Sequence, residues 1–169
     1  ADPLSRRGLP LVIVQPGLVY GPGDTGPSGG TLRNYLRRRL PMVPRGSAYC
    51  WGHVDDMARA HIQAMERGKA GESYIVAGPP HTLIEALAIA QQITGVPAPR
   101  VHPSPGLLKG AAAIMRMVER TGVPVPPPLS SEYLRVAAGV TYLGSNARAR
   151  REIGLVGRPL ATGLRGKFF

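Results

Sequence analysis

Leu11-Val-Ile-Val-Gln-Pro16-Gly-Leu-Val-Tyr20-Gly-Pro-Gly-Asp24 is the stretch from which the fold of this chain is best deduced. Its four consecutive apolar residues, Leu11 to Val14, include β-branched side chains and predict a strand buried on both faces. The Pro and Gly residues that follow end the strand sharply. In an open parallel sheet, ligands bind beyond the carboxyl ends of the strands, so residues 16–24 form a candidate binding loop. A purely structural turn explains the same pattern.

Composition limits the classes of protein to which the chain can belong. A sequence of 169 residues with 43% hydrophobic content can bury one core. Its net charge of +11 suggests a polyanion as partner, but aromatic residues make up only 5%, which leaves little for base stacking. We therefore expect no nucleic-acid partner, and a basic nucleic-acid binder remains only a third alternative function. The single cysteine, Cys50, fits a reducing compartment, and no apolar run reaches the roughly 20 residues of a membrane span. Together these features predict a cytoplasmic protein.

The order of the expected elements indicates the α/β class. Strand patterns alternate with helical ones, which favours a parallel sheet covered by helices. Asp55 and Thr82 are each placed to cap the helix that follows. Strands are expected at residues 11–15, 48–54, 74–77 and near 100–102, and helices at 32–40, 56–67, 83–94, 106–121, 131–138 and 146–153, with one more turn within 158–169.

The longest helical pattern, residues 106–121, admits two interpretations. Its broad apolar stripe is typical of a core helix or of the wall of an apolar pocket. A membrane-surface helix is the alternative. The sparse polar face favours the first interpretation; it carries Lys109, Arg116, Glu119 and Arg120.

Three motifs in succession resemble landmarks of the extended short-chain dehydrogenase/reductases, the NAD-dependent epimerase/dehydratase family. They are Pro16-Gly-Leu-Val-Tyr-Gly-Pro-Gly-Asp24, Trp51-Gly-His-Val-Asp-Asp-Met-Ala-Arg-Ala-His61 and Ser145-Asn-Ala-Arg-Ala-Arg-Arg-Glu-Ile-Gly154. The chain is most similar to members related to dihydroflavonol reductases and hopanoid-associated sugar epimerases. The resemblance implies the C-terminal part of a Rossmann-type parallel sheet, from residues 1–24 and 51–78. A mostly helical substrate-binding lobe would comprise residues 25–50 and 79–169.

The resemblance also implies a cofactor, NAD or NADP, and a small-molecule substrate for a longer parent protein. The family's glycine-rich loop and its Tyr-x-x-x-Lys pair are missing, because none of the six tyrosines has a Lys four residues later. Hydride transfer needs that tyrosine hydroxyl to move a proton. We therefore expect no catalytic residue here, weak or no cofactor binding, and no activity of this chain by itself. A non-catalytic cofactor-sensing or protein-interaction relative remains the alternative function, and a homodimer remains open for the parent.

Binding residues follow from the same resemblance. The backbone of Pro16, Gly17, Leu18 and Val19 would lie against the nicotinamide. Tyr20 and Trp51 would border the substrate. Arg33 and Arg37 are candidate phosphate contacts, with a solvated helix face as the competing explanation. The glycines at positions 23, 26 and 29 match a phosphate-loop pattern. Seven residues separate Gln15 from the first of these glycines, and Pro27 lies within the pattern, so we expect no phosphate there.

The second landmark predicts structural residues rather than ligands. His53, Asp55 and Asp56 would anchor the following helix by capping and packing. Together with His61 they could also form a metal site, but the two histidines are eight residues apart across a strand-to-helix junction, so we expect none. Members that act on nucleotide-diphosphate sugars usually carry a phosphate-clamping Arg four residues before this His. Tyr49 stands there, which favours an uncharged or apolar ketone or aldehyde substrate.

Overall fold

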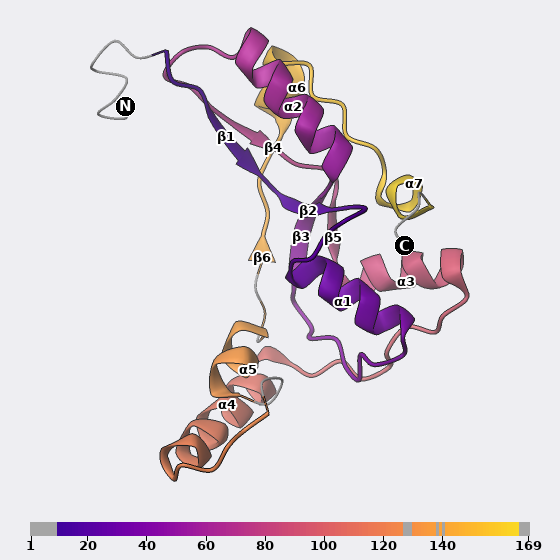
Figure 1. Ribbon diagram of the computed structural model, residues 1–169, viewed down its shortest axis with the longest axis vertical. Helices are drawn as coiled ribbons and strands as arrows, with labels where there is room; N and C mark the ends of the chain where they lie inside the picture. The colour runs from indigo at the N-terminus through magenta and orange to yellow at the C-terminus, as the bar shows by residue number, and fades with distance from the viewer. Residues whose placement is uncertain (1–9, 127–129, 138, 140, 166–169) are drawn as a thin grey trace. The chain divides into compact units, whose positions relative to one another are not determined.

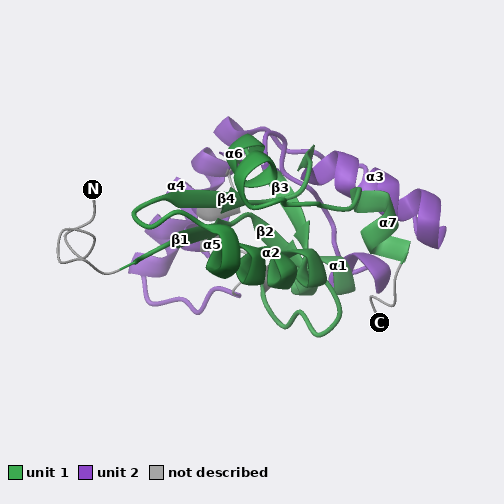
Figure 2. Ribbon diagram, turned by 90° about the horizontal axis from the view of Figure 1, so that it is seen from above, with its two compact units in different colours: residues 1–33, 49–81, 142–169 green, residues 34–48, 82–141 purple. Residues whose placement is uncertain are grey.

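A computed structural model of the chain describes residues 10–126, 130–137, 139 and 141–165. The chain divides into two compact units, which Figure 2 colours separately. Unit 1 comprises residues 1–33, 49–81 and 142–169, and unit 2 comprises residues 34–48 and 82–141. These units are defined by compactness. The expected division into a sheet and a substrate lobe concerns their roles and stays a prediction.

Parallel strand pairing in unit 1 confirms the α/β class. Strand β1 (Ile13–Pro16) runs parallel to β4 (Ser73–Val76), and β2 (Leu18–Tyr20) runs parallel to β3 (Ala48–His53). Figure 1 shows β1 leading directly into β2. The remaining strands both pair with β3; they are β5 (Pro80–Thr82) and β6 (Thr141–Tyr142).

Helices occupy most of the segments between the strands. None in the described part of the chain combines the length and the apolar character needed to span a bilayer. Unit 2 contains α3 (Leu83–Thr94), α4 (Pro105–Arg120) and α5 (Ser131–Ala137). The others are α1 (Pro27–Leu36), which continues from unit 1 into unit 2, and α2 (Val54–Arg67), α6 (Ala147–Glu152) and α7 (Leu160–Arg165) of unit 1.

The core of unit 1 lies between α2, β4 and α6. Met57, Ala60 and Ala64 of α2 pack with Tyr74 and Val76 of β4. Ala149 of α6 and, after the end of that helix, Ile153 and Leu155 complete the cluster. Small alanines on α2 let the helix approach the strand closely.

Strand β1 is buried on one face only, so the expectation of a strand buried on both faces is wrong for this chain. Val12 and Val14 pack against the core cluster, whereas Ile13 between them is 37% exposed. Successive side chains of a strand point to opposite sides. On the second side of β1, Ile13 and Gln15 are exposed.

Several predicted element ends are confirmed and others are corrected. Thr82 caps α3 in a reciprocal capping box with Glu85, and Gly95 ends the helix with φ of 70°, as the sequence predicts. No strand forms at residues 100–102. That segment is held instead by single backbone bonds, from Val43 N–H to the carbonyl of Val101 (2.9 Å) and from Arg45 N–H to that of Pro103 (3.0 Å).

Candidate functional site

The candidate loop begins where the chain passes from one sheet to the other. Gly17 joins β1 to β2, and its N–H donates to the Val76 carbonyl at 3.0 Å. A Cβ atom at this position would lie 2.4 Å from the Cys50 carbonyl oxygen. The close approach of two backbones therefore requires glycine here, whether or not a cofactor binds.

Tyr20, at the end of β2, is a core residue of unit 1. Its side chain is only 1% exposed, and the edge contacts of its ring reach Trp51 (5.9 Å between centroids) and His53 (5.5 Å). A Cβ at Gly163 of α7 would lie 2.0 Å from the Tyr20 hydroxyl oxygen, so α7 covers that hydroxyl. Burial raises the pKa of Tyr20 to about 12, although the charge of Arg158 opposes the rise. Tyr20 therefore keeps its proton at neutral pH.

Trp51 and Tyr49 belong to an aromatic stack on β3. Trp51 is buried and its Nε1 donates to the His81 carbonyl at 3.1 Å. Tyr49 contacts the Trp51 ring edge-on and stacks on Tyr142, with centroids 6.4 Å apart and planes at 29°. The position that would hold a phosphate-clamping Arg is thus part of a packed aromatic group. A direct substrate contact by Trp51 stays a prediction, because its side chain reaches no described pocket.

A pocket of about 190 Å³ brings part of the predicted site together. It lies at the end of β2, and Val19, Tyr20, Val54 and the Gly21–Asp24 loop line it. Ligand pockets usually measure about 300–1,000 Å³, so this one does not enclose a dinucleotide. It lies beside the half-buried Leu18 and Val19, and a contact of this strand end with a nicotinamide stays a prediction. Pro16 lies outside this lining.

The glycine pattern at positions 23, 26 and 29 forms a self-capped loop. The Asp24 carboxylate accepts the Gly26 N–H at 2.7 Å and the Ser28 hydroxyl at 2.9 Å. A Cβ at Gly29 would lie 2.2 Å from the Asp24 carbonyl oxygen. Because the chain's own carboxylate sits at the start of α1, an anion would be repelled from this place. The same capping explains why α1 begins at Pro27, earlier than the predicted Leu32.

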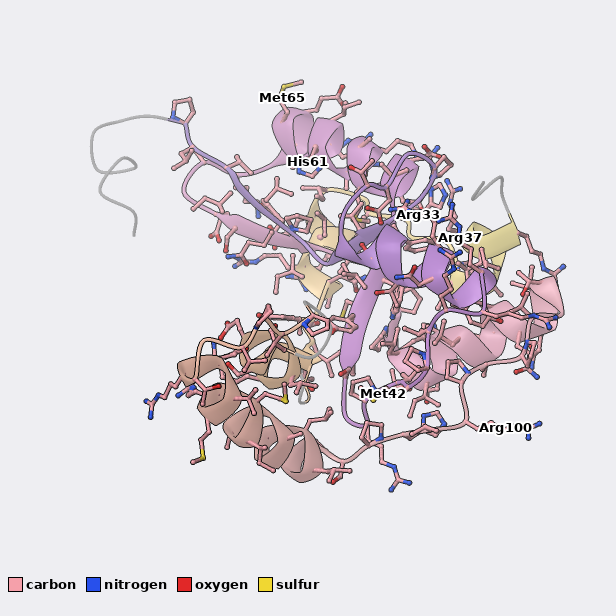
Figure 3. The ribbon with its side chains drawn as sticks, turned by 60° about the horizontal axis from the view of Figure 1, so that its bottom comes forward. Arg33, Arg37, Met42, His61, Met65 and Arg100 are labelled. Carbon is pink, nitrogen blue, oxygen red and sulfur yellow. The ribbon has the colours of Figure 1, made fainter. Side chains whose placement is uncertain are left out.

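The two candidate phosphate-binding arginines differ in their surroundings. Arg33 donates from Nη1 to the Asp24 carbonyl and so stabilises the loop. Arg37, labelled in Figure 3, follows the end of α1 and is exposed. Neither lines the pocket at the end of β2, so a phosphate contact by either residue stays a prediction.

His53 caps α2, which corrects the expectation that Asp55 does so. The helix begins at Val54, and the His53 Nδ1 accepts the Asp55 N–H at 3.3 Å. Burial, followed by the charge of Arg158, lowers the pKa of His53, so its ring is neutral and free to accept this bond. His61 bonds the carbonyl of Met57 on its own helix at 2.7 Å. Among the described residues, no three His, Cys, Asp or Glu side chains gather as a metal site.

Asp56 and Arg158 are joined by several hydrogen bonds. Asp56 is 2% exposed, and Arg158 donates to it from its backbone N–H (2.9 Å), from Nε (3.0 and 3.1 Å) and from Nη2 (2.8 Å). Burial alone would raise the pKa of Asp56, but the hydrogen bonds from Arg158 outweigh it and lower that pKa. Sequence reasoning missed Arg158. A buried acid requires a cation, but the chain offers 21 lysines and arginines without marking which one folds back onto Asp56.

Comparison with known proteins finds a matching family model and a related protein. The model of the NAD dependent epimerase/dehydratase family matches residues 4–77. Sterol demethylase protein B of Methylococcus capsulatus is 32% identical over 152 residues, which are 89% of this chain and 46% of that protein.

Two solved structures share the fold. The crystal structure of gox2253 is 27% identical with a TM-score of 0.78, over 96% of this chain and 49% of that one. PA4631, a nucleoside-diphosphate-sugar epimerase from Pseudomonas aeruginosa, is 26% identical with a TM-score of 0.70, over 95% of this chain and 47% of that one. The chain thus spans about half the length of the proteins it matches.

Proposed function

Because this chain belongs to the NAD-dependent epimerase/dehydratase family, we propose that it supplies the C-terminal part of an NAD(P)-dependent reductase or epimerase acting on a small substrate. NAD or NADP is the cofactor of this family. The proposed substrate carbon carries a carbonyl or an alcohol. Bound NAD or NADP would supply hydride transfer to or from that carbon.

The residues of this chain would position the reactants and carry no chemistry themselves. The strand end at Pro16 to Val19 would border the nicotinamide, next to the pocket at the end of β2. Tyr20, with its raised pKa, would shape this edge and move no proton. The sequence holds no Tyr-x-x-x-Lys pair, so this chain by itself would catalyse no hydride transfer.

The aromatic stack around Tyr49 is the observation that carries the substrate class. A guanidinium holds phosphate through two parallel hydrogen bonds, which a tyrosine ring packed between Trp51 and Tyr142 cannot reproduce. An uncharged or apolar ketone or alcohol therefore fits better than a nucleotide-diphosphate sugar. The similarity to a protein named for sterol demethylation supports this choice.

The test compares two substrate classes in the complete reading frame that contains this chain. We expect NAD(P)H-dependent reduction of a hydrophobic cyclic ketone, followed at the reduced nicotinamide absorbance, with a higher kcat/KM than for any nucleotide-diphosphate sugar. The Tyr49→Arg variant should lose activity on the ketone and gain affinity for the sugar nucleotide. Tyr49→Phe, which keeps the stack, is the matched control.

Two outcomes contradict the proposal. A wild-type preference for the sugar nucleotide would exclude the apolar substrate class. Measurable hydride transfer by the 169-residue chain alone would show that the proton-transfer residues lie within it.

A further inference from the structure

Helix α4 of unit 2 presents two apolar stripes on different faces. Leu108, Ala112 and Met115 form one stripe, which packs with Leu134 of α5 and with Met42, labelled in Figure 3. This half of the helix meets the expectation of a core helix. The other half does not, because its apolar side chains point into solvent.

The solvent-facing stripe follows a regular helical spacing. Leu107, Gly110, Ile114 and Met117 are separated by three, four and three residues, which places them along one face of a helix. Leu107 is 65% exposed, Ile114 64% and Met117 70%. No pocket described in the structure includes them. Isolated exposed apolar residues are common, but three large ones aligned along one helix indicate a contact surface.

The charges of α4 define what this stripe can contact. Lys109, Arg116 and Arg120 are exposed and follow one another along a neighbouring face of the helix. The one acidic residue of the helix, Glu119, faces α5, where it accepts the Ser131 N–H at 2.8 Å and the Ser131 hydroxyl at 2.6 Å. The exposed side of α4 is therefore apolar and largely cationic, and Glu119 and Glu132 of α5 lie near enough to Arg116 to offset part of its charge.

We propose that α4 binds the surface of an anionic lipid bilayer. Leu107, Ile114 and Met117 insert at the boundary between headgroups and acyl chains, and the lysine and arginines contact lipid phosphates. The long side chains of Lys and Arg reach the headgroup level from the side of such a helix. This inference concerns a surface remote in sequence from the cofactor loop and does not depend on the proposed hydride transfer.

The experiment measures co-sedimentation of the whole chain with vesicles of phosphatidylcholine alone or with 30% phosphatidylglycerol. We expect binding to the anionic vesicles that weakens as salt increases. Neutralising one cation near the surface costs about fivefold in partitioning, so Arg116→Gln with Arg120→Gln should lower it about 25-fold. Ile114→Glu with Met117→Glu should abolish it. Arg67→Gln with Arg150→Gln, an equal charge change on exposed residues of unit 1, is the matched control.

Other results would overturn the proposal. Met65 is an exposed methionine of α2. If Met65→Glu reduces vesicle binding as much as Ile114→Glu with Met117→Glu does, the contact with the vesicle is not specific to α4. If sedimentation equilibrium without lipid shows a dimer that the α4 variants dissociate, a second copy of the chain covers the stripe. Equal binding to neutral and anionic vesicles would show that the cations of α4 do not contribute to membrane binding. Unchanged circular dichroism and Tm of each variant establish that the fold is retained.

Discussion

Asp56, at the start of α2, and Arg158, just before α7, are 102 residues apart in sequence and are joined by four hydrogen bonds. Arg59 adds a contact to the same carboxylate at 2.5 Å. The contact anchors the C-terminal segment to α2, next to the hydroxyl of Tyr20 that α7 covers. It therefore holds the segment before α7 close to Tyr20, which lines the pocket at the end of β2.

Loss of this pair should destabilise unit 1. Removing one partner of a buried ion pair costs about 3–5 kcal/mol, because the other charge stays buried without compensation. Asp56→Asn should therefore lower the free energy of unfolding by at least about 2 kcal/mol, since Arg158 keeps partial access to solvent. Urea denaturation followed by circular dichroism measures it. Arg59→Ala, which removes a 63% exposed partner, should cost less than about 1 kcal/mol. Equal effects of the two substitutions would contradict the assigned role.

Stability should also fall as the pH drops below about 6.5, the ordinary pKa of histidine. The pKa of His53 is lowered in the folded chain, chiefly by burial, so the unfolded chain binds more protons in this range. The contribution is full above about pH 6.5 and is lost toward the folded-state pKa, with a slope of at most about 1.4 kcal/mol per pH unit.

The check is the urea midpoint of the wild type and of His53→Asn at pH 7.5 and 5.5. Asparagine keeps a capping oxygen and does not titrate, so its midpoint should change less. Asp56, whose pKa lies below the usual value, contributes only to a separate loss below about pH 4. An equally steep decline in the variant between pH 7.5 and 5.5 would assign the effect to another group.

Gly78 should tolerate no side chain. A Cβ there would lie 1.8 Å from the carbonyl oxygen of Trp51, so Gly78→Ala must displace β3 from its neighbour. We expect Gly78→Ala to lower the free energy of unfolding by about 1–3 kcal/mol. Gly110→Ala on α4 is the matched control, because its Cβ would meet nothing within 4 Å and alanine favours a helix by up to about 1 kcal/mol. Thermal unfolding of both variants gives the comparison, and a stable Gly78→Ala protein would disprove the close approach.

The exposed apolar residues of α2 beside β1 should make the chain self-associate. A hollow of about 240 Å³ lies between this helix and the side of β1 that faces it, lined by residues that include Val12, Val14 and Met65. Met65 is 78% exposed and Ile62 52%; Figure 3 labels Met65 and His61 on this helix. Ile62→Glu with Met65→Lys should lower light scattering at high protein concentration. A monomeric wild type with a cooperative Tm above about 60 °C would contradict this expectation.

The sequence alone determined the local features and the family. Runs of β-branched residues, the Pro and Gly residues that end them, and the Thr82 cap act through the conformations of neighbouring residues. The sequence therefore predicted α3 and the strands β1, β3 and β4, but not the short strands β2, β5 and β6. The motifs at Pro16, Trp51 and Ser145 gave the family because their order and spacing are specific. The pattern also allowed the glycines at 23, 26 and 29 to be rejected as a phosphate loop.

Only the tertiary structure decided which residues meet. It paired Arg158 with Asp56, made His53 the cap of α2, and buried Tyr20 and Trp51, which the sequence had assigned to a substrate wall. It also divided the apolar residues of α4 into a buried and an exposed stripe. Periodicity reports that a helix is apolar, but burial depends on which partners pack against each face. Those partners come from distant segments, and one sequence does not specify their pairing.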